Sequence, residues 1–452
     1  MVARRVRLWL AVILLLGTAP IRPPEAVAAD PARTVLILPY AATELPPQER
    51  WLGEAVTHIL SLALAPLPAF VQVDPKRLAR LVRPPAWAES TSLDAARSLK
   101  ADIALFGEIQ RVSGDVLVFQ PSYLESHNGS RKRRDLGALA VRQETLLEQL
   151  GALPLAYVRA LGIPLSDAEV ARIGKAARPT LSRSALEAYV KGREAALEGT
   201  QEGTATAADL LARAVELDYN FAPAQYYLGV VHQALGNRWK AAAQFRASIH
   251  LDKTYPEPWK SLGDLFLTTP RRLFDQAVEA YQKAVALRPF YADAYVGLGN
   301  AKAARGDVDG AVEAYNQALR YDPANPKVYV SLGKIYYAEK DLYYEAVAAY
   351  KQAIELDAEF LGARMGLGEL YEEKGLYQDA IAQYGKVIEL ESDHTGALYN
   401  LAVAYEKVDP REAVARWEHY IDVASHLPAE KDWVDVARQH LKKLKAQFRK
   451  DR

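Results

Sequence analysis

Apolar and small residues recur at a nearly constant spacing over the C-terminal half of the chain. A Leu-Gly pair is followed by a stretch in which an alanine precedes an aromatic residue by four positions. The pairs end at Gly229, Gly263, Gly299, Gly333 and Gly368, and subtraction of these numbers gives intervals of 34, 36, 34 and 35 residues. This period, with helical spacing inside each copy, predicts repeated pairs of antiparallel helices.

The second helix of each pair carries its own signature of small and aromatic residues. The sets are Ala241, Phe245 and Ser248; Ala277, Tyr281 and Ala284; Ala311, Tyr315 and Ala318; Ala346, Tyr350 and Ala353; Ala380, Tyr384 and Val387; and Ala413, Trp417 and Tyr420. Ala207, Leu211 and Ala214 mark a first copy, so we expect about seven hairpins, with weaker first helices around Lys191-Gly192 and Leu401-Ala402. Stacking such hairpins buries one continuous core, with small residues admitting the aromatic rings.

The stack is expected to span residues 184–425, and the segment 426–452 is expected to cap it. Apolar residues in this last segment follow helical spacing, with lysines between them. They are Trp433, Val436, Ala437, Leu441 and Leu444. A terminal helix with one apolar and one polar face is what the end of a repeat stack requires.

Residues 30–163 follow a different pattern, with short apolar runs alternating with amphipathic stretches. We predict strands at 34–39 and 70–73, helices at 48–65 and 92–100, a β-hairpin from 101–111 and 115–124, and a helix at 143–161 that breaks at Pro154. The order β-α-β-α-β-β-α predicts a small α+β domain. Residues 164–183 are the expected junction before an all-α solenoid.

The N-terminus has the pattern of a secretory signal. Arg4, Arg5 and Arg7 precede the apolar run at 8–17, and small residues follow at 26–29. The run is short for a membrane span, which needs about 20 apolar residues. We therefore expect residues 1–29 to be a cleaved signal peptide and the protein to be exported, as to a bacterial periplasm, with no transmembrane span after cleavage. The alternative is an uncleaved signal that anchors the protein in the inner membrane.

Composition narrows the function classes. Lysine plus arginine equals aspartate plus glutamate, 56 against 56, so no net charge attracts nucleic acid. The absence of cysteine excludes disulfides, thiolate ligands, a cysteine nucleophile and a lipoprotein anchor. The eight histidines show no metal-ligand spacing, and no phosphate-binding or nucleophile-elbow motif is present. We therefore expect no catalytic, metal or cofactor site, and no nucleic-acid partner.

Two local motifs have both a functional and a structural interpretation. The basic run Arg131-Lys132-Arg133-Arg134 could contact an anionic partner, but charge runs usually face solvent, and we predict a solvated loop after the hairpin. Gly297-Leu-Gly299 and Gly366-Leu-Gly368 superficially suggest a nucleotide-binding loop. They fall inside predicted helices at repeat positions, so we predict close packing instead.

The repeat resembles the tetratricopeptide repeat family, with Trp259, Leu262, Gly263 and Phe266 as its best single match. The resemblance covers about residues 185–425 and implies a protein that binds a protein or peptide partner in a groove lined by the first helix of each hairpin. It places ten residues on that groove: Tyr226, Lys260, Asp264, Asn300, Lys334, Tyr337, Glu369, Glu372, Glu373 and Tyr399. Asn300 and Lys334 match positions that carboxylate-binding relatives use, whereas Asp264 and Glu369 depart from that clamp.

The first domain resembles the N-terminal domain of TolB and related bacterial envelope domains. The residues that carry this resemblance are Val35-Leu-Ile-Leu-Pro39, Trp51-Leu52-Gly53, Ala104-Leu-Phe-Gly107-Glu-Ile, Asn128-Gly129 and Leu165-Ser-Asp-Ala-Glu-Val. It implies an adaptor role in the cell envelope, although the β-propeller of TolB is absent. The leading hypothesis is thus a non-enzymatic envelope scaffold. Alternatives are a membrane-anchored signalling or envelope-assembly accessory, and a small-ligand receptor or enzyme in the first domain.

Overall fold

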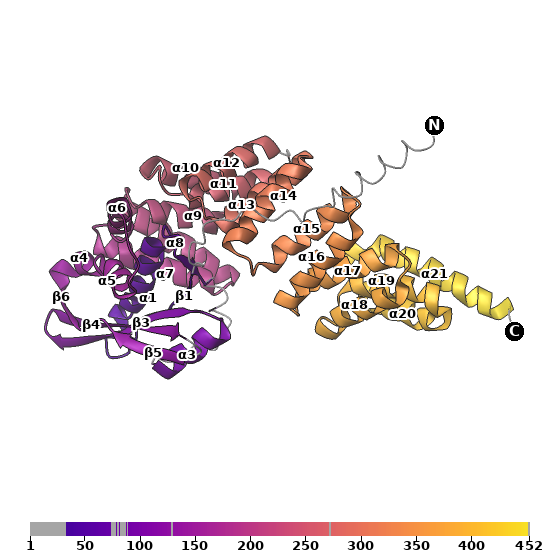
Figure 1. Cartoon of the computed structure of the whole chain (residues 1–452), viewed down its shortest axis with the longest axis horizontal. Helices are drawn as coiled ribbons and strands as arrows, with labels where there is room; N and C mark the ends of the chain where they lie inside the picture. The colour runs from indigo at the N-terminus through magenta and orange to yellow at the C-terminus, as the bar shows by residue number, and fades with distance from the viewer. Residues whose placement is uncertain are drawn as a thin grey trace, which may run out of the picture. The chain divides into compact units, whose positions relative to one another are not determined.

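The computed structural model describes residues 33–73, 78, 81, 87, 89–127, 130–270 and 273–450. The predicted signal peptide and Asn128-Gly129 lie outside this part of the chain. The chain divides into two compact units, one ending at Val190 and the other beginning at Lys191 (Figure 1). The first is an α+β unit and the second is entirely helical, as the sequence predicts.

The first unit is built on a six-stranded mixed sheet. Its strands are β1 Arg33–Ile37, β2 Phe70–Gln72, β3 Ile103–Ser113, β4 Val116–His127, β5 Ser130–Asp135 and β6 Leu139–Arg142. The order is β2-β1-β3-β4-β5, and β6 also pairs with β4. β1 is parallel to β2 and β3, whereas β3 and β4 form the predicted antiparallel hairpin. Gly114 has a φ of +41° in the turn between them, a conformation that favours glycine.

The basic run is part of strand β5, so the predicted loop is wrong. Lys132 lies opposite Glu125 of β4, and the Arg133 guanidinium donates to Asp135 at 2.8 Å. β5 ends the main path of the sheet, and Lys132, Arg133 and Arg134 are exposed. Charged side chains on an edge strand stay hydrated and discourage pairing with another chain. A strand at the edge can therefore carry a charge run that would not be expected inside a sheet.

The predicted helix at 143–161 is three short elements. They are the 3-10 helix η2 Gln143–Thr145, α4 Leu146–Leu150 and α5 Leu153–Ala160. The break falls at Gly151 and Ala152, and Pro154 occupies the first turn of α5. Proline is well tolerated there because the first amide groups of a helix have no intrahelical acceptor. Pro154 therefore helps to begin a helix rather than kinking one.

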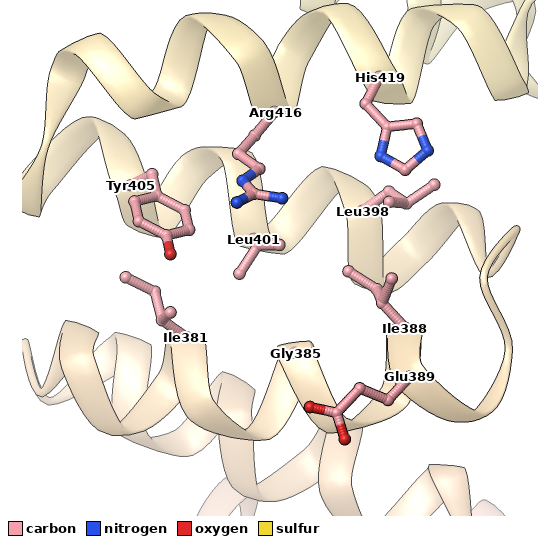
Figure 2. Close-up of a pocket in the computed structure, with 9 residues that line it drawn as sticks. All are labelled: Ile381, Gly385, Ile388, Glu389, Leu398, Leu401, Tyr405, Arg416 and His419. Atoms are coloured by element: carbon pink, nitrogen blue, oxygen red, sulfur yellow. The ribbon is translucent and has the colours of Figure 1, made fainter.

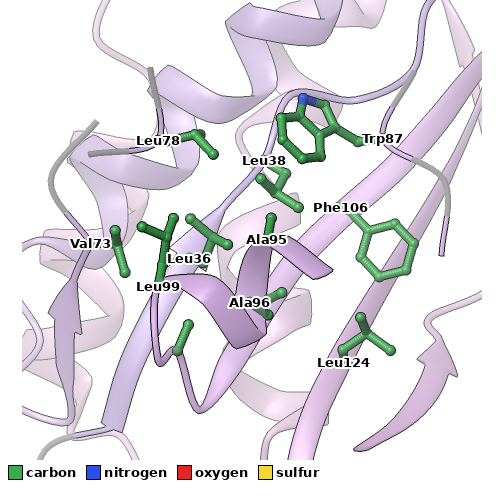
Figure 3. Close-up of a cluster of buried hydrophobic side chains, with 12 residues drawn as sticks. Leu36, Leu38, Val73, Leu78, Trp87, Ala95, Ala96, Leu99, Phe106 and Leu124 are labelled. Atoms are coloured by element: carbon green, nitrogen blue, oxygen red, sulfur yellow. The ribbon is translucent and has the colours of Figure 1, made fainter. Parts of the chain in front are cut away.

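Helices cover both faces of the sheet. α1 Trp51–Leu64, α5 and α6 Asp167–Ala176 pack together on one side, and α3 Glu89–Ser98 contacts β3 on the other. Figure 3 shows the core on the α3 side. Its buried residues are Leu36, Leu38, Val73, Leu78, Trp87, Ala95, Ala96, Leu99, Ala101, Ala104, Phe106 and Leu124. Alternate residues of β1 and β3 enter this core because successive strand side chains point to opposite faces.

Two glycines of the envelope-domain resemblance, Gly53 and Gly107, lie against Tyr40, which leaves no space for a side chain at either position. A Cβ at Gly53 would lie 2.3 Å from the Tyr40 carbonyl oxygen, and one at Gly107 would lie 2.5 Å from the Tyr40 ring. The Tyr40 hydroxyl meets that of Tyr157 at 2.5 Å, and Tyr157 donates to the Phe106 carbonyl at 2.9 Å. Burial raises the pKa of both phenols. Gly53 therefore makes room for the backbone of Tyr40, and Gly107 makes room for its ring.

The expected junction at 164–183 contains helix α6. Ser166 and Glu169 form a reciprocal capping box at its start, and Ile173 is fully buried. The next helix, α7 Arg183–Leu197, crosses the boundary between the units. Its first half belongs to the first unit, where Arg183 lies 3.8 Å from Glu49.

The second unit is a stack of helical hairpins. After α7 come α8 Gln201–Leu217, α9 Ala222–Ala234, α10 Arg238–Leu251, α11 Glu257–Leu267, α12 Phe274–Leu287, α13 Ala292–Arg305 and α14 Val308–Tyr321. There follow α15 Pro326–Ala338, α16 Tyr343–Leu356, α17 Leu361–Glu373, α18 Tyr377–Leu390, α19 Thr395–Val408, α20 Pro410–Ala424 and the terminal α21 Lys431–Lys450. We call the odd-numbered helices from α9 to α19 the A helices and the even-numbered helices from α10 to α20 the B helices.

The B-helix residues Tyr281 and Tyr350 are each inserted between two A helices. A Cβ on Gly263 would lie 2.8 Å from the Tyr281 ring, and one on Gly297 of the next hairpin would lie 2.2 Å from it. Tyr350 meets Gly333 and Gly366 in the same way, at 3.0 and 2.5 Å. These contacts confirm that the glycine pairs serve close packing.

Helix α21 closes the stack, as predicted, but its buried face is slightly rotated from the expected one. Val434, Ala437 and Leu444 are buried, whereas Trp433 is 55% exposed. Glu406 of α19 accepts from Trp417 Nε1 at 2.7 Å and lies 2.8 Å from His440 Nδ1 of α21. One carboxylate thus connects three helices at the end of the stack.

Candidate partner-binding surface

The ten predicted groove residues all lie on A helices. α9, α11 and α13 contact one another in series, and so do α15, α17 and α19. Side chains on neighbouring A helices are therefore close enough to form one surface. The structure brings six of the ten together on α15, α17 and α19, and gives the other four defined contacts on α9, α11 and α13.

Asp264 and Asn300 accept hydrogen bonds from the buried B-helix tyrosines. The Tyr281 hydroxyl donates to Asp264 Oδ1 at 2.6 Å, and the Tyr315 hydroxyl donates to Asn300 Oδ1 at 2.6 Å. Lys260 pairs with the other Asp264 oxygen at 2.8 Å. Burial raises the pKa of Tyr281, followed by the nearby charge of Asp264. Because a buried hydroxyl without a partner costs stability, these side chains act first as parts of the hairpin core.

Tyr226 packs among aromatic side chains. Its ring centroid lies 4.9 Å from that of Tyr227, 5.4 Å from Tyr255 and 5.8 Å from Phe245. Ser261 lies within 3.5 Å of its hydroxyl, and burial raises its pKa. Edge-to-face ring contacts of this kind stabilise a core beyond simple burial. Its contacts are those of a packing residue.

The remaining residues on α15 and α17 form a mixed-charge cluster. Lys334 and Glu369 are exposed, and Glu372 is half-buried. Neighbouring protein atoms remove part of the hydration of the exposed Glu369 carboxyl and raise its pKa; the Lys334 charge lowers it, and the Glu372 charge raises it further. Partial burial also raises the pKa of Glu372, while a hydrogen bond from Tyr384 at 2.9 Å and the Lys407 charge lower it. The pKa of each carboxylate is raised overall, so the nearby lysines of the repeat stack do not fully balance its loss of hydration.

Tyr337 and Glu373 extend this cluster. Partial burial and a hydrogen bond to Glu373 raise the pKa of Tyr337 to about 12. The Lys374 ammonium lies 5.6 Å from the Tyr337 ring centroid and 5.4 Å from that of Tyr343. The tyrosine thus presents a ring that already attracts a cation, beside an exposed carboxylate.

Tyr399 forms the end of the surface on α19. Its ring makes edge contacts with Trp417 at 5.0 Å, Tyr420 at 5.4 Å and Trp433 at 5.4 Å between centroids. Trp433 comes from α21, so the terminal helix contributes an exposed aromatic ring next to the predicted residue. Sequence reasoning assigned Trp433 to the cap alone.

Glu406, Lys374 and Lys407 were also missed by the sequence analysis. A usable signal was present for Glu406, which follows Ala402 by four positions, as Glu372 follows Gly368 and Tyr337 follows Gly333. The seventh hairpin has alanine where the others have glycine, so its register was marked less clearly. Within the described residues, no group of three or more histidine, aspartate or glutamate side chains could hold a metal ion.

A stack of helical hairpins in which B-helix aromatic rings pack on A-helix glycines defines a helical repeat protein. The family model described as "TPR repeat" matches residues 274–304 and 299–340, and the one described as "Tetratricopeptide repeat" matches 332–393. Residues 274–393 therefore consist of tetratricopeptide repeats, and proteins with such repeats are generally non-catalytic scaffolds for protein–protein interaction.

Crystal structures of other repeat proteins are similar to part of the chain. One is YrrB, described as a TPR protein with an unusual peptide-binding site, which is 25% identical to this chain. The match covers 45% of this chain and 100% of YrrB, with a TM-score of 0.35. TTC0263, a thermophilic TPR protein from Thermus thermophilus, is 26% identical over 41% of this chain and 99% of its own, with a TM-score of 0.35. The MamA protein is 25% identical; the match covers 38% of this chain and 93% of MamA, with a TM-score of 0.34. No curated protein matches the sequence.

Proposed function

We propose that the protein is a non-catalytic scaffold that binds a protein or peptide partner across α15, α17 and α19. The observation that carries this proposal is the surface of Lys334, Tyr337, Glu369, Glu372, Glu373 and Tyr399, which combines accessible rings with partly desolvated carboxylates. Aromatic anchors supply contact energy in an interface, and surrounding charges supply orientation and specificity. A partner segment that carries a lysine or arginine would compensate Glu369, Glu372 and the exposed Glu373.

Peptide selection on the immobilised full chain tests this proposal. Selected peptides should lose about tenfold or more in affinity when Glu369→Lys and Glu373→Lys are combined. The reason is that the ion pairs between these carboxylates and the peptide become buried on binding, and loss of such a pair commonly costs over about 1.4 kcal/mol. The matched control is Glu355→Lys with Lys351→Glu on the B helix α16, which should bind as the parent does. Peptides that bind both variants and the parent equally would contradict the assignment of this surface.

We further propose that the scaffold works outside the cytoplasm, with the first unit as its adaptor. The support is the sequence pattern of residues 1–29 and the envelope-domain resemblance. No helix in the described part of the chain combines the length and apolar character that crossing a bilayer demands. N-terminal sequencing of the protein from a bacterial periplasmic fraction should find a start near Asp30. Recovery only in membranes with Met1 retained would favour the anchored alternative.

A further inference from the structure

A pocket of about 370 Å³ opens between α18, α19 and α20 (Figure 2). α19 supplies its floor through Leu398, Leu401 and Tyr405, and α18 supplies an apolar wall through Ile381 and Ile388. The volume lies at the lower end of small-molecule sites, which occupy about 300–1,000 Å³. None of the ten predicted groove residues lines it, so it is separate from the proposed partner-binding surface.

Gly385 lines this pocket, and no neighbouring atom requires a glycine at this position. A Cβ built on it meets no atom within 4 Å, whereas one on Gly366 would lie 2.5 Å from the Tyr350 ring. It lies inside helix α18, where glycine is less favourable than alanine, and its φ is not positive. The residue after the aromatic in the other B helices is Arg246, Gln282, Asn316, Lys351 or Glu418. Each of those would extend a side chain where Gly385 leaves space.

Arg416 gives the opposite wall a defined polarity. Its Nη2 pairs with Glu412 at 2.5 Å, and its guanidinium lies 5.4 Å from the Tyr405 ring centroid. Its Nε is buried and has no hydrogen-bond partner among the described residues. In Figure 2, Arg416 and His419 project from α20 toward the space between the helices. Glu412 occupies Nη2 and Nε is buried, so a further anion in the pocket would meet the remaining nitrogen, Nη1.

Glu389 at the far rim does not oppose an anion strongly. It is paired with Lys386 at 2.6 Å and is exposed. The pocket is therefore apolar along α18 and α19, and its polar feature is the Arg416 guanidinium, one edge of which already pairs with Glu412. That combination matches a molecule with an apolar body and a single carboxylate.

We propose that this pocket binds a medium-chain fatty acid, with its chain over Ile381, Ile388 and Leu401 and its carboxylate at Arg416. The same chemistry occurs at the C-terminus of a peptide that ends in leucine. We assign the free acid because helices bound the pocket on three sides and its volume suits a small molecule.

Titration of the full chain with decanoate, followed by calorimetry below the concentration at which decanoate self-associates, tests this inference. We expect one saturable site, with decan-1-ol bound about tenfold or more weakly because it lacks the charge. Absence of saturable decanoate binding, or equal binding of the alcohol, would overturn the proposal. Binding of a leucine-terminated peptide without decanoate binding would also overturn it.

Two variants locate the site. Gly385→Gln should fill the pocket and Arg416→Gln should remove its charge, and each should weaken decanoate binding by about tenfold or more. Lys351→Ala, at the equivalent position of α16, is the control and should bind as the parent does. Circular dichroism and melting curves establish that each variant is folded. Unchanged binding by folded Gly385→Gln would refute the location, whatever happens to peptide binding on the A helices.

Discussion

At the scale of single residues, the array depends on how closely an aromatic ring approaches a glycine. A methyl group at Gly297 would lie 2.2 Å from the Tyr281 ring, which is itself buried between two hairpins. We expect Gly297→Ala to lower the free energy of unfolding by about 1–3 kcal/mol, because an overpacked core must shift. Urea denaturation measures this change.

Gly385→Ala provides the matched control for that substitution. Its added Cβ meets nothing within 4 Å, so only helix propensity changes. We expect the variant to be about 0.5–1 kcal/mol more stable than the parent. If both alanine variants shifted stability in the same direction, the steric role of Gly297 would be wrong.

Charge at the partner-binding surface should make stability depend on pH. Partial loss of hydration holds the pKa of the exposed Glu369 carboxyl above its ordinary value. Such a carboxyl binds its proton more tightly in the folded state, so it favours folding below its unfolded pKa, and this contribution disappears as the pH rises through the folded pKa. Glu369→Gln should therefore be slightly more stable than the parent at pH 7.

That advantage should shrink as the pH falls toward about 4, where the parent carboxyl also becomes neutral. Urea denaturation of parent and variant at several pH values measures the difference. Because Glu369 is exposed, we expect a difference of no more than a few tenths of a kcal/mol. A variant less stable than the parent at pH 7 would mean that attraction to Lys334 dominates.

At the scale of elements, the β3–β4 hairpin depends on its approach to Tyr40. A Cβ at Gly107 would lie 2.5 Å from the Tyr40 ring and 2.7 Å from the Gln120 carbonyl of β4. We expect Gly107→Ala to destabilise the first unit by about 1–3 kcal/mol, because the backbone oxygen cannot rotate away. Gly174→Ala in α6 meets nothing within 4 Å and should not be destabilising. Thermal denaturation monitored by near-ultraviolet circular dichroism distinguishes the two.

The attachment of α21 to the stack depends on Glu406. Removing this carboxylate leaves the buried Trp417 Nε1 without its acceptor, and His440 loses its partner. We expect Glu406→Ala to cost about 1–3 kcal/mol and to speed hydrogen exchange in α21. The control is Glu418→Ala, which breaks the exposed Glu418–Lys445 pair at 2.6 Å and should cost less than about 1 kcal/mol. If the two variants lost the same free energy of unfolding, the buried hydrogen bond from Trp417 would not stabilise the attachment of α21.

At the scale of the whole molecule, stability should be local. Each hairpin contacts mainly its neighbours, so the free energy of the array is close to a sum over adjacent pairs. Hydrogen exchange of Gly297→Ala should therefore show faster exchange in α12 to α14 and unchanged protection in β1 and β3. Loss of protection across both units at once would indicate one cooperative unit.

The helical half of the fold could be read from the sequence because its information is local. The 34- to 36-residue period located the hairpins, their small and aromatic residues, and the capping helix. The first unit was less predictable. Strand β5 was missed because its charge run is typical of a loop, and a strand at a sheet edge tolerates such a run. Pro154 suggested a kink because proline's effect depends on where a helix begins.

The sequence by itself determined where the hairpins lie, how many there are and which residues lie on the A helices, because helical periodicity links residues only a few positions apart. Only the tertiary structure decided that Asp264 and Asn300 serve buried tyrosines, that Glu369 and Glu373 remain accessible, and that Gly385 opens a pocket beside Arg416. The partner of a polar side chain depends on how closely the next hairpin approaches, and the sequence of one repeat does not contain that distance.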